Sequence, residues 1–204
     1  MRPLADKSIP AGPSLAPKDC ILFSGAHAGA ETEFGSLAEK YKIVEKNFSF
    51  SGRDVVRKRG LIILKPAELR QGEVSRFYLQ TTMKREFSDS EDFKKVLQTI
   101  WHQVNPAQEV FAIGLIQHDK TVKGGTGWAV ELAKQLNKPV HVYDQSAKQW
   151  YNWDDSKWTA CDTPRIQYHK FVGTGTSKLT EDGKKAIHDL FQQTFTDKPP
   201  CTEP

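Results

Sequence analysis

The stretch Val122–Ala133 (VKGGTGWAVELA) decides the fold, because it joins a hydrophobic run, Glu109–Ile116 (EVFAIGLI), to a segment with apolar residues at helical spacing. This order predicts a strand, a glycine-rich turn and a helix. Glycines let backbone N–H groups approach an anion, and a helix that begins at the turn adds the positive end of its dipole. The turn therefore predicts a phosphate cradle for a nucleotide-like ligand, although a plain tight turn also explains its glycines. The expected ligand contacts in this loop are Gly124, Gly125, Thr126 and Gly127.

Strand-like and helix-like segments alternate along most of the 204-residue chain. The expected strands are residues 19–24, 61–65, 109–116, 139–144 and 165–173. The expected helices are residues 32–41, 87–104, 127–136 and 179–195. Residues 148–162 interrupt the alternation, because aromatic residues on both sides of an Asp-Asp-Ser turn indicate a small β-hairpin at the sheet edge. The pattern predicts an α/β fold: a single Rossmann-like domain with a mostly parallel sheet flanked by helices and ligands at the carboxyl ends of the strands.

The two ends of the chain differ from the middle. Residues 1–18 hold four prolines without hydrophobic periodicity, and residues 197–204 read DKPPCTEP. We expect both ends to be flexible and residues 19–196 to form one nucleotide-binding domain.

The composition argues against several classes of protein. The 29 basic and 25 acidic residues give a formal charge of only +4, which is a slight excess and not a concentrated basic patch. The three cysteines are widely spaced and lack zinc-ligand spacing, so we expect neither a disulfide framework nor a metal site. The sequence shows no signal-peptide core and no membrane-spanning run. We expect a soluble, cytoplasmic protein in a reducing compartment, with no membrane partner and no identified cofactor besides a nucleotide-like ligand.

A first glycine loop, SGAHAGAETEFGSLA (residues 24–38), follows the first expected strand. Its glycines permit close approach of a ligand or unusual backbone dihedral angles. Glu31 and Glu33 either contact a ribose hydroxyl or only stabilise the helix N-terminus through its dipole. The expected ligand contacts in this loop are Ser24, Gly25, Ala26, His27, Gly29 and Glu31.

A third glycine loop, VGTGTSKLTEDGKKAI (residues 172–187), follows the last expected strand, with Thr180 as the expected N-cap of the next helix. Hydroxyl residues beside glycines suit an anion site, and they equally suit a plain strand-to-helix connection. The expected ligand contacts are Gly173, Thr174, Gly175 and Thr176. Asp144 ends the strand 139–144, where it either contacts a ribose or caps the turn that follows.

Glu131 lies one turn into the helix that follows the second glycine loop. A carboxylate there, close to a bound sugar, would act as a general base or accept a ribose hydroxyl. Alternatively, Glu131 is a surface residue that pairs with Lys134 or Lys138. It is the one candidate catalytic residue.

Together, the three loops resemble the Rossmann-like SLOG superfamily, which includes the Lonely Guy phosphoribohydrolases, the DNA-processing protein A family and the YpsA-like and molybdenum-carrier-like proteins. The first loop resembles SGGxxGxDxxA, with Ala26 in place of the second glycine and Glu31 in place of the acid. GGTGWAVE resembles the GGxGTxxE part of the phosphoribohydrolase motif, which assigns the catalytic carboxylate to Glu131, but it departs at Lys123 and Trp128.

The third loop resembles the GSRxxTxxG motif that opens the DNA-processing family. Here it follows the other two loops, which implies a circular permutation as in the YpsA-like branch. The family arginine is replaced by Gly175 or Thr176, and residues 113–123 also lack the arginine that phosphoribohydrolases place ahead of the second loop. The resemblance further implies a homo-oligomer that pairs through helices beside the site.

Three functions follow from these patterns. The first is a binding module that holds a nucleotide or nucleotide-derived small molecule as a sensor, carrier or sequestering protein. The alternative is an enzyme that hydrolyses the N-glycosidic bond of a nucleoside or nucleotide with Glu131. The third is single-stranded nucleic-acid binding, in which the aromatic residues of the hairpin stack on bases, although such residues more often cover a sheet edge or form a subunit contact. These aromatic residues are Trp150, Tyr151, Trp153 and Trp158.

Overall fold

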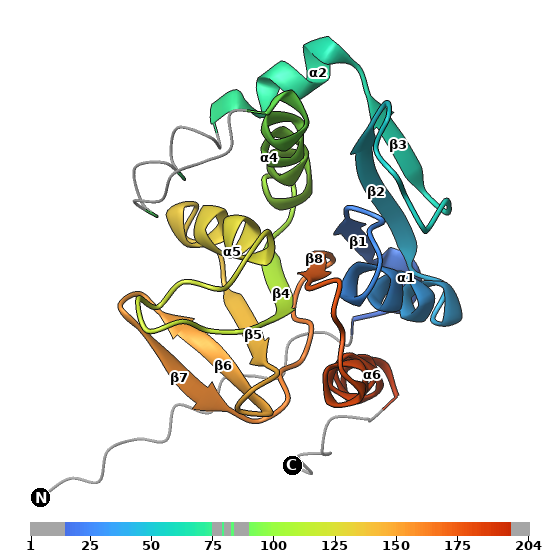
Figure 1. Cartoon of the computed structure of the whole chain (residues 1–204). Coiled ribbons are helices and arrows are strands. Elements are labelled where there is room, and N and C mark those ends of the chain that lie inside the picture. Colours follow the sequence, from blue (N-terminus) through green and yellow to red (C-terminus); the bar gives the residue numbers. More distant parts are fainter. Residues whose placement is uncertain (1–14, 75–78, 80–82, 84–89, 197–204) are drawn as a thin grey trace, which may run out of the picture.

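A computed structural model gives the structure of the chain and describes residues 15–74, 79, 83 and 90–196 (Figure 1). Its centre is an eight-stranded sheet in the order β3-β2-β1-β8-β4-β5-β6-β7. The strands are β1 (Ile21–Ser24), β2 (Val44–Phe50), β3 (Leu61–Leu64), β4 (Glu109–Gly114), β5 (Val140–Asp144), β6 (Gln149–Asp154), β7 (Lys157–Cys161) and β8 (Lys170–Gly175). The described helices are η1 (Pro17–Asp19), α1 (Ala30–Lys40), α2 (Pro66–Gln71), α4 (Glu91–Val104), α5 (Thr126–Gln135) and α6 (Glu181–Phe195).

The neighbours from β3 to β5 pair in parallel, and β6 and β7 add an antiparallel hairpin at one edge. The predicted α/β class, the mostly parallel sheet and the hairpin are therefore confirmed. Most expected helices begin or end within two residues of the observed ones. The expected helix 87–104 is observed from Glu91, and its first residues, 87–89, lie outside the described part of the chain.

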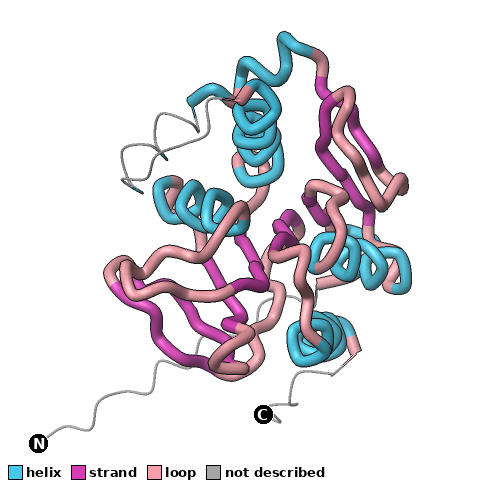
Figure 2. Tube along the Cα trace, in the orientation of Figure 1, coloured by secondary structure: helices cyan, strands magenta, loops and turns pink. Residues whose placement is uncertain are grey.

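Helices cover both faces of the sheet (Figure 2). Helices α1 and α6 pack together on one face, and α4 and α5 pack together on the other. Strand β4 is buried along its whole length, so its side chains alternate between the two cores. Val110 and Ala112 contact the core beneath α4 and α5, whereas Phe111 and Ile113 contact the core beneath α1 and α6.

Strand β2 was not predicted, because its pattern of burial is inverted. Its buried side chains include Glu45, Asn47 and Ser49, while Val44 is exposed. Glu45 is stable there because Arg57 and Arg59 both form ion pairs with its carboxylate. A strand whose polar residues face inward does not show the alternation that identifies a half-buried strand.

Strand β8 begins at Lys170, later than the expected residue 165, because Glu109 holds the segment before it. The Oε1 atom of Glu109 accepts hydrogen bonds from the backbone N–H groups of Gln167 (2.9 Å) and Tyr168 (2.8 Å). Its Oε2 atom is buried and has no hydrogen-bond partner among the described residues. Burial raises the pKa of Glu109 to about 7, even though the two N–H donors lower it.

This buried carboxyl predicts a pH-dependent stability. The folded-state pKa lies above the ordinary value, so folding favours the protonated form, and stability falls as pH rises from about 4.5 through about 7. Glu109→Gln keeps an acceptor for both N–H groups and removes the charge. It should raise the free energy of unfolding by about 2 kcal/mol at pH 8 and change it little at pH 5 in urea titrations. Exposed Glu181→Gln is the control, and an equal gain at both pH values would contradict the prediction.

The structure bears only in part on the predictions for the chain ends, membrane spans, metal sites and location. The predicted flexible ends lie outside the described residues, except for residues 15–18, where Leu15 packs against the core and η1 begins. No helix in the described ranges is both long and apolar enough to cross a membrane. Within those ranges, no cluster of three or more His, Cys, Asp or Glu side chains could hold a metal ion. The cytoplasmic location stays a prediction.

Candidate functional site

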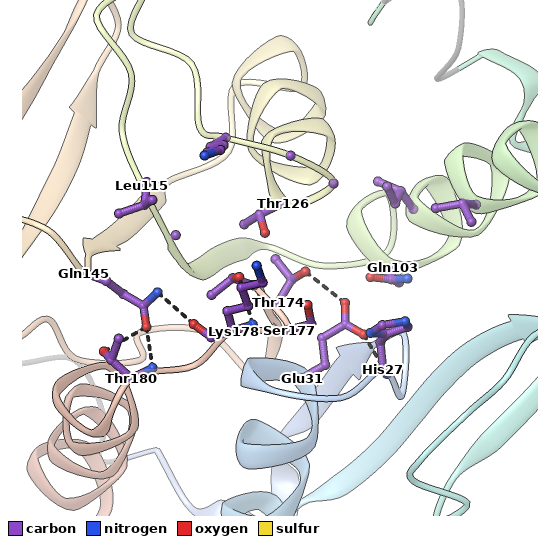
Figure 3. A pocket seen from close by; sticks show the side chains of 18 of the residues that line it. His27, Glu31, Gln103, Leu115, Thr126, Gln145, Thr174, Ser177, Lys178 and Thr180 are labelled. Carbon is purple, nitrogen blue, oxygen red and sulfur yellow. Dashed lines mark hydrogen bonds between the residues drawn. The ribbon is translucent and has the colours of Figure 1, made fainter. Parts of the chain in front are cut away.

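A cavity of about 650 Å³ opens at the carboxyl ends of β1, β4, β5 and β8 (Figure 3). Strand β8 lies between β1 and β4, and the chain leaves β1 toward β2 on one side and β4 toward β5 on the other. The loops after β1 and β4 therefore diverge at this point, which is where parallel α/β sheets bind ligands. All three glycine loops contribute residues to the cavity.

The structure brings half of the predicted site residues to the cavity. Those that line it are His27, Glu31, Gly124, Gly125, Thr126, Thr174, Gly175 and Thr176. Those that do not line it are Ser24, Gly25, Ala26, Gly29, Gly127, Glu131, Asp144 and Gly173. The second group shapes the loops and helices that surround the cavity.

Three residues of the first loop fix its backbone. At Gly25, an added Cβ would lie 2.8 Å from Oε2 of Glu31, so the Glu31 side chain would have to shift. Ala26 has a φ of 59°, and its carbonyl oxygen accepts a hydrogen bond from the N–H of Val56. Gly29 has a φ of 89°, and a Cβ there would overlap the backbone of the third loop. These residues support a tight loop and do not line the cavity.

The predicted residues Ser24, Asp144 and Gly173 also hold neighbouring segments together. The hydroxyl of Ser24 donates to the carbonyl of Gly173 at 2.7 Å, which joins β1 to β8. The carboxylate of Asp144 accepts from the N–H groups of Ile116 (2.8 Å) and Ser146 (2.8 Å). Asp144 thus caps the turn after β5, which is one of the two roles that its position left open.

Glu131 lies away from the cavity, on the side of α5 that faces the hairpin. It forms a 2.7 Å ion pair with Lys134, whose ammonium group lies 3.6 Å from the ring centroid of Trp153 and 4.5 Å from that of Trp158. Burial lowers the pKa of Lys134, and the carboxylate of Glu131 opposes this shift. The structure therefore shows the pairing with Lys134 that the sequence offered as the alternative to catalysis, although the pair is buried and not on the surface.

The N-terminus of α5 has no side-chain cap. Gly125 is the N-cap, no side chain caps the helix, and no acidic residue lies in its first turn. Gly124 has a φ of 72°, which turns the chain into the helix. Thr126 is only 7% exposed and lines the cavity, yet its hydroxyl makes no hydrogen bond to any described residue. The positive end of the helix dipole and an unused hydroxyl donor thus meet at one place.

The helices after the other two loops differ, because both carry acidic residues in their first turn: Glu31 and Glu33 in α1, and Glu181 and Asp182 in α6. Near α1, the carboxylate of Glu31 accepts from the N–H of His27 (2.9 Å) and the hydroxyl of Thr174 (3.1 Å). At α6, the hydroxyl of Thr180 accepts from the N–H of Gly183 at 3.1 Å, as the expected N-cap. Among the described residues, only the second of the three glycine loops therefore leads into a helix with neither a side-chain cap nor an acidic residue in its first turn.

One wall of the cavity comes from α4 and was missed by sequence reasoning. Val96, Thr99, Ile100 and Gln103 line the cavity from one face of this helix. Gln103 is 3% exposed, and its carboxamide has no hydrogen-bond partner among the described residues. The signal in the sequence is a glutamine at helical spacing within an otherwise apolar stripe, which is where a core side chain would be expected.

An arginine also reaches the cavity from a distant part of the chain. Arg53 follows β2, lines the cavity and lies over the ring of Phe50, with 5.8 Å from its Cζ atom to the ring centroid. Burial lowers its pKa from the ordinary value, and Glu31 opposes this shift. Arg53 thus places a cation in the wall of the cavity, from a loop that the sequence did not single out.

The cavity also has a polar end near β5, where Gln145 accepts from the backbone N–H of Thr180 at 2.8 Å and donates to the carbonyl of Lys178 at 3.2 Å.

The resemblance of the loops to the SLOG superfamily and the homo-oligomer that it implies stay predictions. Comparison of the chain with protein-family models, with curated protein sequences and with solved structures finds no significant match.

Proposed function

We propose that the cavity binds a nucleotide or another nucleotide-derived small molecule that carries a phosphate. The observation that carries the proposal is the uncapped N-terminus of α5, which opens into the cavity beside the unpartnered hydroxyl of Thr126. A phosphate at this place accepts hydrogen bonds from backbone N–H groups and from the hydroxyl, and it neutralises the helix dipole.

Other features of the cavity support the same ligand class. Its volume of about 650 Å³ suits a nucleotide-sized molecule. The exposed ammonium groups of Lys123 and Lys178 lie at its rim and attract an anion. Glu31 lines the cavity, and its carboxylate retains lone pairs that can accept from ribose hydroxyl groups. We assign the phosphate to α5 and the ribose to Glu31.

Binding is better supported than hydrolysis. Cleavage of an N-glycosidic bond needs a carboxylate next to the reacting carbon atom. Glu131 is turned away and paired with Lys134. Among the described residues, Glu31 is the one carboxylate that lines the cavity, and each of its oxygen atoms already accepts a hydrogen bond from the protein. We therefore favour a sensor, carrier or sequestering protein.

Nucleic-acid binding is less well supported by the aromatic hairpin. Trp150 is 3% exposed, and Trp153 and Trp158 pack against each other and cover the ammonium group of Lys134. Side chains that are engaged in this way do not offer open ring faces to single-stranded bases. The hairpin thus covers an edge of the sheet and the end of α5.

The proposal predicts that Thr126→Val weakens the binding of phosphate-bearing ligands. Valine keeps the shape of threonine and removes the hydroxyl donor, so the affinity for ribose 5-phosphate should fall about tenfold or more, as expected for a hydrogen bond to a charged group. Isothermal titration calorimetry with ribose 5-phosphate and the four common ribonucleoside monophosphates measures the change.

Thr159→Val is the matched control, because Thr159 is exposed on β7, far from the cavity in sequence and in the fold. It should bind like the unmodified protein. If binding is unchanged in Thr126→Val, or is lost equally in both variants, the phosphate does not bind at the N-terminus of α5. A folded protein that binds none of the five compounds would overturn the proposed function itself.

A further inference from the structure

The phosphate site does not account for Gln103. This residue lies on α4, lines the cavity and is 3% exposed. None of the hydrogen bonds in the described part of the chain involves its carboxamide, and Figure 3 accordingly shows it without a dashed line. The carboxamide atoms are not fully buried, so they open into the cavity, where only water or a ligand can pair with their donor and acceptor. A ligand that fills the cavity would supply the missing partners.

The surroundings of Gln103 are partly polar and partly apolar. Its Nε2 atom approaches the same point beside Gly25 as the carboxylate of Glu31, at 3.0 Å and 2.8 Å from the position of a Cβ there. On its own helix, Val96 and Ile100 provide an apolar wall. Figure 3 places Gln103 beside Glu31 and away from Gln145, at the other end of the cavity. This end joins one hydrogen-bonding amide to an apolar surface.

A nucleobase matches this combination. Its edge presents a donor and an acceptor side by side, as a carboxamide does, so glutamine pairs with a base through two hydrogen bonds. The flat faces of a base are apolar and suit an aliphatic wall. A sugar phosphate without a base would leave both the amide and the wall unused.

We propose that Gln103 recognises the edge of a nucleobase and that the ligand is therefore a nucleotide and not a sugar phosphate. This inference rests on the proposed function, since it assumes that the phosphate binds at α5. The ligand then spans the cavity, with its phosphate at Thr126, its ribose at Glu31 and its base against α4.

The test compares the ribonucleoside monophosphates with ribose 5-phosphate by calorimetry. The unmodified protein should bind at least one nucleotide about tenfold more tightly than ribose 5-phosphate. Gln103→Met has nearly the same size and cannot form the pair of hydrogen bonds. This substitution should weaken the binding of that nucleotide about tenfold and change the affinity for ribose 5-phosphate by no more than a factor of about two.

Gln98→Met is the matched control, because Gln98 lies on the same helix but does not line the cavity and donates to Glu73. Nucleotides that bind no more tightly than ribose 5-phosphate would overturn the role of Gln103 and leave the phosphate site intact. This comparison needs no variant, so it decides the matter even if Gln103→Met fails to fold. A Gln103→Met protein that loses both kinds of ligand equally would also overturn base recognition.

Discussion

Gly127→Ala is expected to lower the free energy of unfolding by about 3 kcal/mol. A Cβ at this position would overlap the carbonyl oxygen of Val122 and lie 3.3 Å from Cε of Met83. The carbonyl belongs to the backbone of the loop between β4 and α5, so it cannot move aside as a flexible side chain can. The helix must shift away from the loop, and the proposed anion site at its N-terminus is disturbed with it.

Gly125→Ala is the matched control for this prediction. Gly125 has a φ of −60°, and the nearest atom to an added Cβ is Cδ1 of Trp128 at 3.9 Å. We expect a change in stability of about half a kcal/mol or less. Urea denaturation of both variants measures the difference, and equal losses would show that the glycines act only through conformational freedom.

Glu131→Ala is expected to lower the free energy of unfolding by about 3 to 5 kcal/mol. The side chains of Glu131 and Lys134 are 6% and 8% exposed, so removal of the carboxylate leaves a buried ammonium group without its ion-pair partner, beside the aromatic rings and the carbonyl of Lys120. The double variant Glu131→Leu/Lys134→Met should regain most of this stability, because no unpaired charge remains. Chemical denaturation measures all three proteins.

The exposed pair Lys185–Asp189 provides a comparison at similar spacing on α6. Asp189→Ala should change stability by less than about 1 kcal/mol, since water solvates both partners. Nucleotide affinity should survive in the double variant, which keeps every residue that lines the cavity. If the Glu131→Ala protein is stable but its ligand binding or turnover is impaired, Glu131 instead has a role in the functional site.

The sequence predicted the strands and loops whose residues follow simple rules. The glycine loops after β1, β4 and β8 each follow a buried hydrophobic strand, so their meeting at one edge of a parallel sheet could be inferred. The roles of the individual glycines could not be inferred from the sequence. Gly124 and Gly127 look alike in the sequence, but only the three-dimensional contacts show that one lines the cavity and the other lies against the Val122 carbonyl.

The parts that were missed depend on contacts between distant residues. Strand β2 is stabilised by ion pairs of Glu45 with Arg57 and Arg59, and such pairs leave no local periodicity. Gln103 and Arg53 reach the cavity from elements that come before the second glycine loop and have no motif of their own. Their contribution is visible only once the sheet order is known.

The central position of β8 bears on how the protein is made. It is the last of the eight strands to leave the ribosome, yet it is the strand that joins β1 to β4. Until it inserts, the nascent chain holds two separate half-sheets, each with an unpaired parallel edge that can pair with another chain. Chaperones that shield these edges should therefore raise the yield of folded protein. The proposed nucleotide can favour only the final step of assembly, because the cavity is incomplete before β8 and its loop arrive.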